Sequence, residues 1–399
     1  MLTIAGLFAG IGGIEQGFHR ALGGEVETAL LCEWWGPAQT VLRDRFPDAE
    51  LHPDVRELRD LPSGLDVLAA GFPCTDLSQA GRTAGIRGAQ SGLVGHVFDV
   101  LRVLKRRRRA LPTLLIENVP NMLALDRGHA MAYLVGELER LGYRWAYRVV
   151  DSRFTGVPQR RRRVLLVASA TVDPRGVLFA DEAGEPSPER YGEEAYGFYW
   201  TEGHRGLGWA QDATPTLKGG STIGIPSPPA VWLPGAEPGR KVLVPGVEDA
   251  EALQGFPRGW TAAAADGRRD GARWKLVGNA VTVGVAEWVA GRIASPGEPL
   301  TTGVLYDGAA WPTAAWGQRG RRYAVTMSEY PLLRPYQPLM SVVSRGSAAL
   351  SHRAVAGFAT RLERGNLGRH PGFRADISEH IAITRMAQSS VAPPRVATA

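Results

Sequence analysis

The sequence predicts an α/β protein built on a mostly parallel sheet. Over the first 170 residues, short apolar runs alternate with segments of helical spacing. Such alternation is typical of strands joined by helices, and ligands then bind outside the carboxyl ends of the strands. The chain has 399 residues, 44% hydrophobic and 22% charged, which is ordinary for two or three folded domains with ample core.

The first two strand and helix pairs are expected before residue 50. Residues 2–8 (LTIAGLF) form an apolar run of strand length, and a glycine turn leads from it into a helix near 14–22. Residues 28–32 (TALLC) form the second run, and a helix follows near 37–46.

A second group of runs completes the expected sheet. Residues 66–72 (DVLAAGF) form a strand that ends at Pro73, and 93–107 have the apolar spacing of a helix. The strand at 113–119 (TLLIENV) is of the buried type, and an amphipathic helix follows at 128–142. Two further runs close the series, 143–151 and 162–169.

Changes in composition divide the chain into five parts. The alternating pattern occupies residues 1–171, which we expect to form the catalytic, cofactor-binding domain. Residues 172–248 are rich in glycine, proline and aromatic residues without a helical period, and they predict a separate irregular β-type module. The remaining parts are a return to helical patterning at 249–294, a C-terminal extension at 295–385 with a helix near 350–364, and a disordered tail at 386–399.

Composition excludes several classes of protein. No run approaches the roughly 20 apolar residues that a membrane helix needs, and the N-terminus lacks the basic region of a signal peptide. Two cysteines, Cys32 and Cys74, cannot form a disulfide framework. No Cys/His cluster has zinc spacing, so we expect no metal and a reducing, cytoplasmic location.

The net charge of +6 comes from the last quarter of the chain, where residues 301–399 hold 12 Arg, no Lys and 5 acidic residues. Two interpretations stay open. Arg319, Arg321 and Arg322 lie near aromatic residues and could contact the phosphates of a polyanion. Alternatively, the extension packs against the catalytic domain and its arginines are merely solvated.

The turn after the first run predicts a nucleoside site. Phe8 precedes three glycines, Gly10, Gly12 and Gly13, that let the backbone approach a ligand at the start of a helix. Glu33 follows the second run, 20 residues after Gly13, where an acid can bind ribose hydroxyls.

Two further positions strengthen this prediction. Trp34 could stack on a purine, and Asp54 of the pair Asp54–Val55 could accept an adenine amino hydrogen. Either Glu33 or Asp54 alone would be interpreted as a solvated strand end. Their order at successive strand ends of one sheet favours the nucleoside site.

Cys74 lies where active-site loops are expected, just past a strand in a turn whose entry angle Pro73 sets. Its polar neighbours, among them Ser78, argue against a buried, inert thiol. Glu117 ends the apolar run TLLIE, where a carboxylate is costly unless it is used or paired. A structural capping role for Glu117 is the alternative.

Gln159 begins a run of four arginines that leads directly into the strand VLLVA. Alternation along that lead-in places Arg161 and Arg163 on one face, so this pair can point into a cleft. Consecutive arginines can also form a solvated basic face, as the basic run at 105–109 does at the end of a helix.

Six short blocks, in order, resemble the DNA cytosine carbon-5 methyltransferases of bacterial type. Each block is weakly specific, but the ordered set over residues 3 to about 293 is very specific. The blocks are FAGIGG at 8–13, GFPC at 71–74, ENV at 117–119, GVPQRRRRVLLVA at 156–168, LQGFP at 253–257 and VGNAV at 277–281.

The resemblance implies a Rossmann-like fold that uses S-adenosylmethionine, with a target-recognition domain at about 172–248. It implies that Cys74 adds to carbon 6 of a flipped cytosine, that Glu117 binds ring nitrogen 3 and the exocyclic amine, and that Arg163 binds the base carbonyl. Arg161 would support the loop and the phosphate, and the base would also meet Pro73, Ser78 and Gln159. The implied cofactor contacts are Phe8, Gly10, Gly12, Gly13, Glu33, Trp34, Asp54, Val55, Asn279 and Ala280.

The chain departs from the family pattern at Thr75 and Leu77, where Gln and Phe are usual on the DNA-facing loop. We expect methylation of duplex DNA in restriction-modification or phage defence, with a cognate endonuclease or defence proteins as partners, in the cytoplasm at the nucleoid. The alternatives are a tRNA cytosine-5 methyltransferase and a non-catalytic DNA-binding protein. An amino-group methyltransferase is disfavoured because its Asp/Asn-Pro-Pro-aromatic motif is missing from the sequence.

Overall fold

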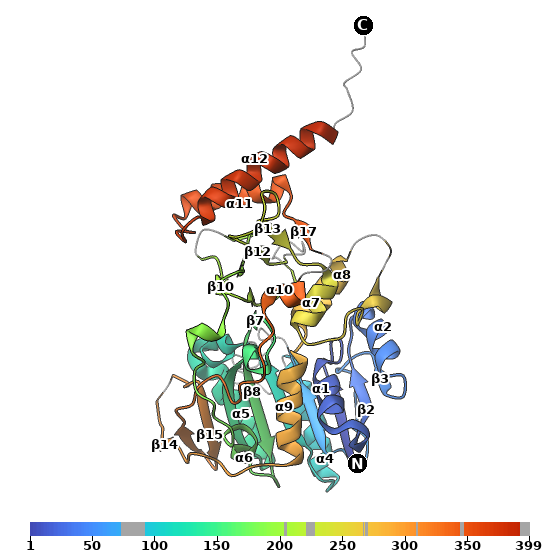
Figure 1. The fold of residues 1–399 in the computed structure, drawn as a ribbon. Coiled ribbons are helices and arrows are strands. Elements are labelled where there is room, and N and C mark those ends of the chain that lie inside the picture. Colours follow the sequence, from blue (N-terminus) through green and yellow to red (C-terminus); the bar gives the residue numbers. More distant parts are fainter. Residues whose placement is uncertain are drawn as a thin grey trace.

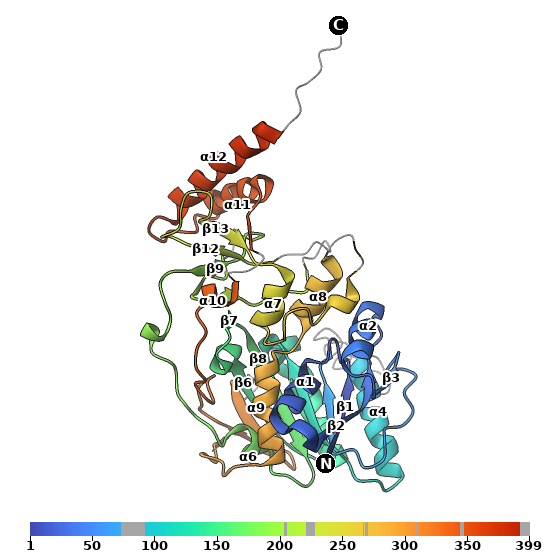
Figure 2. The same cartoon turned by 45° about the vertical axis from the view of Figure 1, so that its right-hand side comes forward.

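The computed structural model describes residues 1–72, 92–202, 206–220, 228–265, 267, 270–308, 310–343 and 347–391. Pro73, Cys74, Thr75, Leu77 and Ser78 lie outside the described residues. The described strands form a ten-stranded sheet, a five-stranded sheet and a two-stranded pair. In Figures 1 and 2 the large sheet and its helices form one layered body, and the five-stranded sheet lies beside it under α11 (His352–Arg364) and α12 (Phe373–Val391).

The large sheet has the order β14-β16-β15-β6-β8-β5-β4-β1-β2-β3. Its strands are β1 (Leu2–Leu7), β2 (Val26–Cys32), β3 (Glu50–His52), β4 (Val67–Ala70), β5 (Thr113–Asn118), β6 (Arg144–Asp151), β8 (Arg162–Ser169), β14 (Val304–Leu305), β15 (Ala314–Gln318) and β16 (Arg321–Ala324). Six strands predicted from the sequence are confirmed in this sheet, namely the runs 2–8, 28–32, 66–72, 113–119, 143–151 and 162–169.

Half of this sheet is antiparallel, so the expectation of a mostly parallel sheet is wrong. The strands β3, β2, β1, β4 and β5 pair in parallel, whereas every pair from β5 to β14 is antiparallel. Parallel neighbours need a long crossover, usually a helix, whereas antiparallel neighbours need only a short connection. Between β6 and β8 the chain holds just ten residues, 152–161, with a short 3-10 turn and β7 (Gln159–Arg160).

Helices cover both faces of the large sheet because successive strand residues point to opposite sides. On one face, α4 (Leu93–Arg106) and α5 (His129–Leu141) bury apolar side chains against Ala5 and Leu68. On the other face, α1 (Gly13–Leu22), α9 (Val283–Ala294) and α6 (Pro174–Leu178) pack on Ile4 and Val67. No helix among the described residues is long and apolar enough to cross a membrane.

A third core joins the edge of the large sheet to the helices α2 (Gly36–Arg45), α7 (Val247–Leu253), α8 (Gly271–Asn279) and α10 (Leu339–Val343). Short 3-10 helices lie at Gly23–Glu25, Pro120–Leu123, Leu125–Gly128, Ser152–Thr155, Pro188–Arg190 and Ala262–Ala264.

The extension expected over 295–385 is shared between the two large parts of the molecule. Its strands β14, β15 and β16 continue the large sheet from β6. Its strand β17 (Ala348–Ala349) joins the five-stranded sheet of β10 (Ala210–Gln211), β9 (Tyr196–Phe198), β12 (Ala230–Trp232) and β13 (Val242–Val244). Helices α11 and α12 then bury Phe358 and Phe373 against Phe198 and Trp232 of that sheet.

The turn between β15 and β16 lies at the end of the sheet opposite the carboxyl ends of β1, β4 and β5. Strand β6 runs parallel to β5 because both pair antiparallel with β8. Gly317 pairs with Trp145 at the start of β6, which places the turn at Arg319 beyond that start. The guanidinium of Arg322 lies 4.9 Å from the ring centre of Trp311. This placement favours the packing interpretation of the extension over contact with DNA phosphates.

Candidate active site

In the glycine turn after β1, one glycine faces open space and another packs closely against a neighbouring backbone. Phe8 has a left-handed backbone, φ 58°, which a bulky residue adopts at a cost of about 1–3 kcal/mol. Gly10 has φ 59° and faces open space, since a Cβ there would meet nothing within 4 Å. A Cβ on Gly13 would lie 2.6 Å from the carbonyl oxygen of Val281, so this glycine permits close packing.

Glu33 fastens this turn to the end of β2. Its Oε2 accepts the N–H of Gly10 at 2.9 Å, and its Oε1 accepts the N–H of Trp35 at 2.9 Å. Burial raises the pKa of Glu33, and the N–H bonds from Trp35 and Gly10 oppose that rise. The carboxylate therefore shapes the site as well as facing it.

A cavity of about 230 Å³ lies over the ends of β1 and β2. Its wall contains five of the expected cofactor contacts, Phe8, Glu33, Trp34, Asp54 and Val55, together with Cys32, Arg56 and Leu93. The Trp34 side chain is 74% exposed, which leaves its ring face accessible to a planar ligand. Hydrogen bonds from Arg56 lower the pKa of Asp54, so this carboxylate stays an acceptor at neutral pH.

A narrower cavity of about 40 Å³ lies beside the first, and Phe8 lines both. Its wall contains Gly10, Gly13, Asn279 and Ala280, which are the other expected cofactor contacts except Gly12. Gly12 lines neither cavity, and a Cβ there would collide with the ring of Phe46. A glycine is needed at position 12 because a side chain would collide with Phe46 and because φ is 77°.

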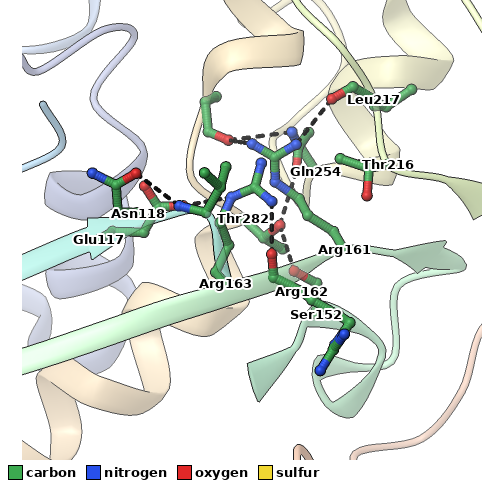
Figure 3. Close-up of polar contacts among 12 residues, drawn as sticks. Glu117, Asn118, Ser152, Arg161, Arg162, Arg163, Thr216, Leu217, Gln254 and Thr282 are labelled. Carbon is green, nitrogen blue, oxygen red and sulfur yellow. Dashed lines mark hydrogen bonds and ion pairs between the residues drawn. The ribbon is translucent and has the colours of Figure 1, made fainter. Parts of the chain in front are cut away.

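Glu117 and Arg163 meet as an ion pair at the ends of β5 and β8 (Figure 3). The Nε of Arg163 lies 2.8 Å from Oε1 of Glu117, and both side chains are about 11% exposed. Glu117 also lines the narrower cavity, so the ion pair borders the expected cofactor site. Next to it, Asn118 donates to the carbonyl of Phe72 at 3.0 Å, which holds the chain just before the segment that contains Cys74.

Arg161 lies beside this pair but is buried, with 1% of its surface exposed. Figure 3 shows its guanidinium among backbone carbonyls, and it donates to Leu217 at 3.0 Å and to Ala280 at 2.7 Å. Burial lowers its pKa, and the nearby Arg163 acts in the same direction, yet an arginine remains protonated in proteins. Arg161 thus joins the backbone at Leu217 to the residue that follows α8.

Gln159 is fully buried and joins the backbone at Leu217 to the end of α7. Its Nε2 donates to the carbonyl of Leu253 at 2.9 Å and to Oε1 of Gln254 at 3.0 Å. Its Oε1 accepts the N–H of Leu217 at 2.9 Å. The structure therefore places Gln159 among protein groups, whereas the resemblance implies contact with substrate.

Sequence reasoning missed two residues that complete this network. Gln254 donates to the carbonyl of Val277 at 3.0 Å, and Thr282 donates to Oε1 of Gln254 at 2.8 Å. Gln254 belongs to the LQGFP block, whose glutamine is a polar residue in an otherwise apolar string. That polarity is the signal that could have identified it.

Cys32 lies in the wall of the larger cavity and is 2% exposed. Burial, followed by the charges of Glu33 and Asp54, raises the pKa of its thiol to about 12. The thiolate is the nucleophilic form of cysteine, so Cys32 is a poor nucleophile at neutral pH.

The fold is a Rossmann-like, S-adenosylmethionine-dependent methyltransferase fold, with a parallel half-sheet, a glycine turn at its first strand end and a cavity beyond that turn. The structure of S. pombe Dnmt2 methyltransferase is similar in fold, with a TM-score of 0.54 and 14% identity, over 73% of this chain and 98% of that one.

Residues 2–179 match the model of the C-5 cytosine-specific DNA methylases. The Type II methyltransferase M2.BsuMI of Bacillus subtilis (strain 168) is 43% identical over 375 residues, which cover 91% of this chain and 94% of that relative. The Type II methyltransferase M.NlaX of Neisseria lactamica is 29% identical over 73% of this chain and 95% of its own length. The chain belongs to the C-5 cytosine-specific DNA methylase family. It is a DNA methyltransferase that uses S-adenosylmethionine as methyl donor, and the tRNA alternative is not favoured.

Proposed function

We propose that the chain methylates cytosine within one specific duplex sequence, as the modification enzyme of a restriction-modification system, and that Cys74, Glu117 and Arg163 act on the base. The observation that carries the proposal is the buried Glu117–Arg163 pair at the border of the cofactor cavity. A cognate endonuclease would be the partner in the cell, and a DNA substrate implies the cytoplasm and the nucleoid. Two of its relatives are named as Type II methyltransferases, which supports this assignment.

The described residues fit S-adenosylmethionine. The larger cavity offers an exposed tryptophan and two carboxylates, and Gly10, which faces open space, lines the narrower cavity. When bound, the cofactor supplies an electrophilic methyl group. Phe8, Glu33, Trp34, Asp54 and Val55 would hold its nucleoside, and Gly10, Gly13, Asn279 and Ala280 would surround its amino-acid end, with Gly12 supporting the turn.

Cys74 would make the base reactive. Carbon 5 of cytosine is a weak nucleophile, and addition of a thiolate at carbon 6 converts the ring into an enamine-like species. Once carbon 5 has accepted the methyl group, its proton leaves to a base, the bond from carbon 6 to sulfur breaks, and the thiolate is regenerated. Cys74 is assigned because the other cysteine, Cys32, is buried with a raised pKa.

Glu117 and Arg163 would bind the polar edge of a flipped base. Glu117 would hydrogen-bond ring nitrogen 3 and the exocyclic amine as the thiolate adds, and Arg163 would donate to the carbonyl oxygen. Flipping costs a few kcal/mol, and hydrogen bonds to the flipped base offset part of that cost. Pro73 and Ser78 would border the base on the same loop as Cys74, while Arg161 and Gln159 would hold the surrounding backbone in place.

Residues 172–248 would choose the DNA sequence, as the target-recognition domain. Leu217 of this segment bonds to Arg161 and Gln159, so the segment is anchored to the strands that carry Arg163. This anchorage would place a DNA-reading surface at a set distance from the flipped base.

Trapping on modified DNA tests the nucleophile. Duplex DNA that carries 5-fluorocytosine should form a denaturation-resistant adduct with the wild-type chain and with Cys32→Ser, but not with Cys74→Ser. An adduct that persists in Cys74→Ser and disappears in Cys32→Ser would reverse the assignment. Bisulfite sequencing of host DNA with and without the gene then identifies the methylated sequence, and equal methylation of all cytosine contexts would refute sequence specificity.

A further inference from the structure

Glu15 is a buried carboxylic acid that the proposed chemistry does not use. It is the third residue of α1 and is 1% exposed, and its Oε2 has no hydrogen-bond partner. No ion pair to Glu15 occurs among the residues that the structure describes. Burial raises its pKa from the ordinary 4.5 to about 7. Such a group is costly without a partner, which suggests that its partner arrives from outside.

Glu15 lies in the wall of the narrower cavity. Gly10, Gly13, Asn279 and Ala280 line that cavity with it. A Cβ on Gly6 would overlap Oε1 of Glu15, so the glycine in β1 provides the space that this carboxyl fills. Strand β1 and helix α1 therefore hold the group at one place.

Helix capping does not account for Glu15. An acid at this position can accept the backbone N–H of the residue that precedes the helix. Here that residue is Gly12, and its N–H donates to the carbonyl of Ala9 at 2.9 Å. The free oxygen of Glu15 is therefore not engaged at the helix end.

The narrower cavity offers an unpaired carboxyl group to a small ligand. Its volume, about 40 Å³, holds a few water-sized groups. Its other acid, Glu117, is already paired with Arg163, and among the described residues no lysine or arginine lines the cavity. The amino-acid end of S-adenosylmethionine carries an α-ammonium, and the adjoining larger cavity suits its nucleoside. An ammonium has three N–H donors, whereas the sulfonium has none.

We propose that Glu15 binds the α-ammonium of S-adenosylmethionine and so anchors the amino-acid end of the cofactor. The inference rests on the cofactor assignment and deepens it. The carboxylate would gain a charged hydrogen-bond donor that it lacks in the protein alone.

Calorimetry with three ligands tests the proposal without any DNA. S-adenosylmethionine and S-adenosylhomocysteine both carry the ammonium, only the first carries a sulfonium, and 5′-methylthioadenosine lacks the whole amino-acid end. Glu15→Gln keeps the shape and removes the charge. We expect it to weaken binding of the first two ligands about 10- to 100-fold and to leave 5′-methylthioadenosine unchanged.

Three outcomes would overturn the proposal. Unchanged affinity for all ligands would mean that Glu15 does not contact the cofactor. Equal loss for all three would indicate a structural role, and loss for S-adenosylmethionine alone would indicate the sulfonium. A chain that shows the expected pattern but methylates no DNA would refute the proposed function and leave this inference intact.

Moving the carboxylate provides a second test. In a Glu15→Ala background, Gly6→Asp would place a carboxylate in the emptied space, and Gly6→Asn would place an uncharged side chain of the same size there. We expect the aspartate chain to bind S-adenosylhomocysteine at least tenfold more tightly than the asparagine chain. Equal affinities would show that no charge is needed at this place and would overturn the proposal.

Discussion

At the scale of single residues, two buried acids near the glycine turn differ in their partners. Glu33 accepts two backbone N–H groups, whereas one oxygen of Glu15 has no partner. Glu33 lines the larger cavity and Glu15 the narrower one, where we propose that the cofactor binds. The hydrogen bonds of Glu33 are made within the protein, whereas we propose that Glu15 gains its missing partner when the cofactor ammonium binds.

Glu15→Gln should stabilise the ligand-free protein at neutral and higher pH. The folded pKa of Glu15, about 7, exceeds its ordinary value of 4.5, so its contribution to stability is fully present below pH 4.5 and is lost as pH rises through 7. The total is of the order of 3 kcal/mol. The other acid that lines this cavity, Glu117, keeps its ion pair with Arg163 in the Glu15→Gln variant, so the comparison concerns Glu15.

Urea unfolding from pH 5 to pH 8 measures this effect. The advantage of Glu15→Gln over wild type should grow across that range, while the exposed control Glu25→Gln should follow wild type. Parallel curves for wild type and Glu15→Gln would contradict the assignment of this buried acid.

Glu33→Ala should weaken binding of all three nucleoside ligands, 5′-methylthioadenosine included. A lost charged hydrogen bond costs roughly 1.5–3 kcal/mol, or about one to two decades in affinity. Calorimetry on the folded variant gives the result, and unchanged binding would remove Glu33 from the site. The contrast with Glu15→Gln separates the nucleoside end of the cofactor from its amino-acid end.

At the scale of elements, a buried polar network joins three segments that are distant in sequence. Arg161 connects Leu217 to the end of α8, Gln159 connects Leu217 to the end of α7, and Gln254 continues the network to Val277. Backbone groups of irregular segments need such partners when they are buried. The network thus replaces regular strand pairing where the recognition segment enters the catalytic part.

Arg161→Met should destabilise the fold by about 3 kcal/mol or more, because several buried carbonyls would lose a charged donor. The neighbouring Arg160 is exposed and donates to the carbonyl of Trp209, so Arg160→Met should cost less than about 1 kcal/mol. The urea midpoints of the two variants give the comparison. Equal midpoints would show that the buried hydrogen bonds of Arg161 do not contribute to the free energy of unfolding.

At the scale of the whole molecule, the last hundred residues serve two bodies. One part extends the large sheet past β6, and the other completes the core of the five-stranded sheet through α11 and α12. An unpaired strand edge or an uncovered apolar face would otherwise remain on each body. The cationic character of this region therefore does not by itself mark a DNA contact.

Replacing Arg319, Arg321 and Arg322 with Gln should leave the salt dependence of DNA binding unchanged. Each phosphate contact would contribute roughly 0.9 to the slope of log affinity against log salt. These arginines lie at the end of the sheet away from the active site, so no contact is expected. A slope lower by about one or more in the folded triple variant would contradict this placement.

Transfer of DNA specificity should require two segments. Residues 172–248 bury Phe198 and Trp232 against Phe358 and Phe373 of α11 and α12. A graft of 172–248 together with 347–391 into a related enzyme should move the methylated sequence, which bisulfite sequencing reads. A graft of 172–248 alone should yield an unstable protein, and a stable chimera that keeps the recipient's sequence would refute the role of this segment.

The sequence by itself predicted six strands of the large sheet and the family, and both are confirmed. The cofactor and catalytic positions stay predictions. The strands and the family blocks depend on local patterns, such as apolar runs of strand length and a glycine turn before a helix, which neighbouring residues set. The strand predicted at 113–119 is an example, since it is confirmed as β5. Alternation predicted that Arg161 and Arg163 share a face, but the ion pair of Arg163 with Glu117 was seen only in the structure.

Only the tertiary structure decided the antiparallel half of the sheet, the sharing of the C-terminal region and the burial of Glu15. Each depends on contacts between residues far apart in sequence, whose free energy no local pattern records. Strand β15 pairs with β6 across more than 160 residues. Glu15 reads as an ordinary first-turn acid of a helix until the missing side chain of Gly6 gives its carboxyl a buried place.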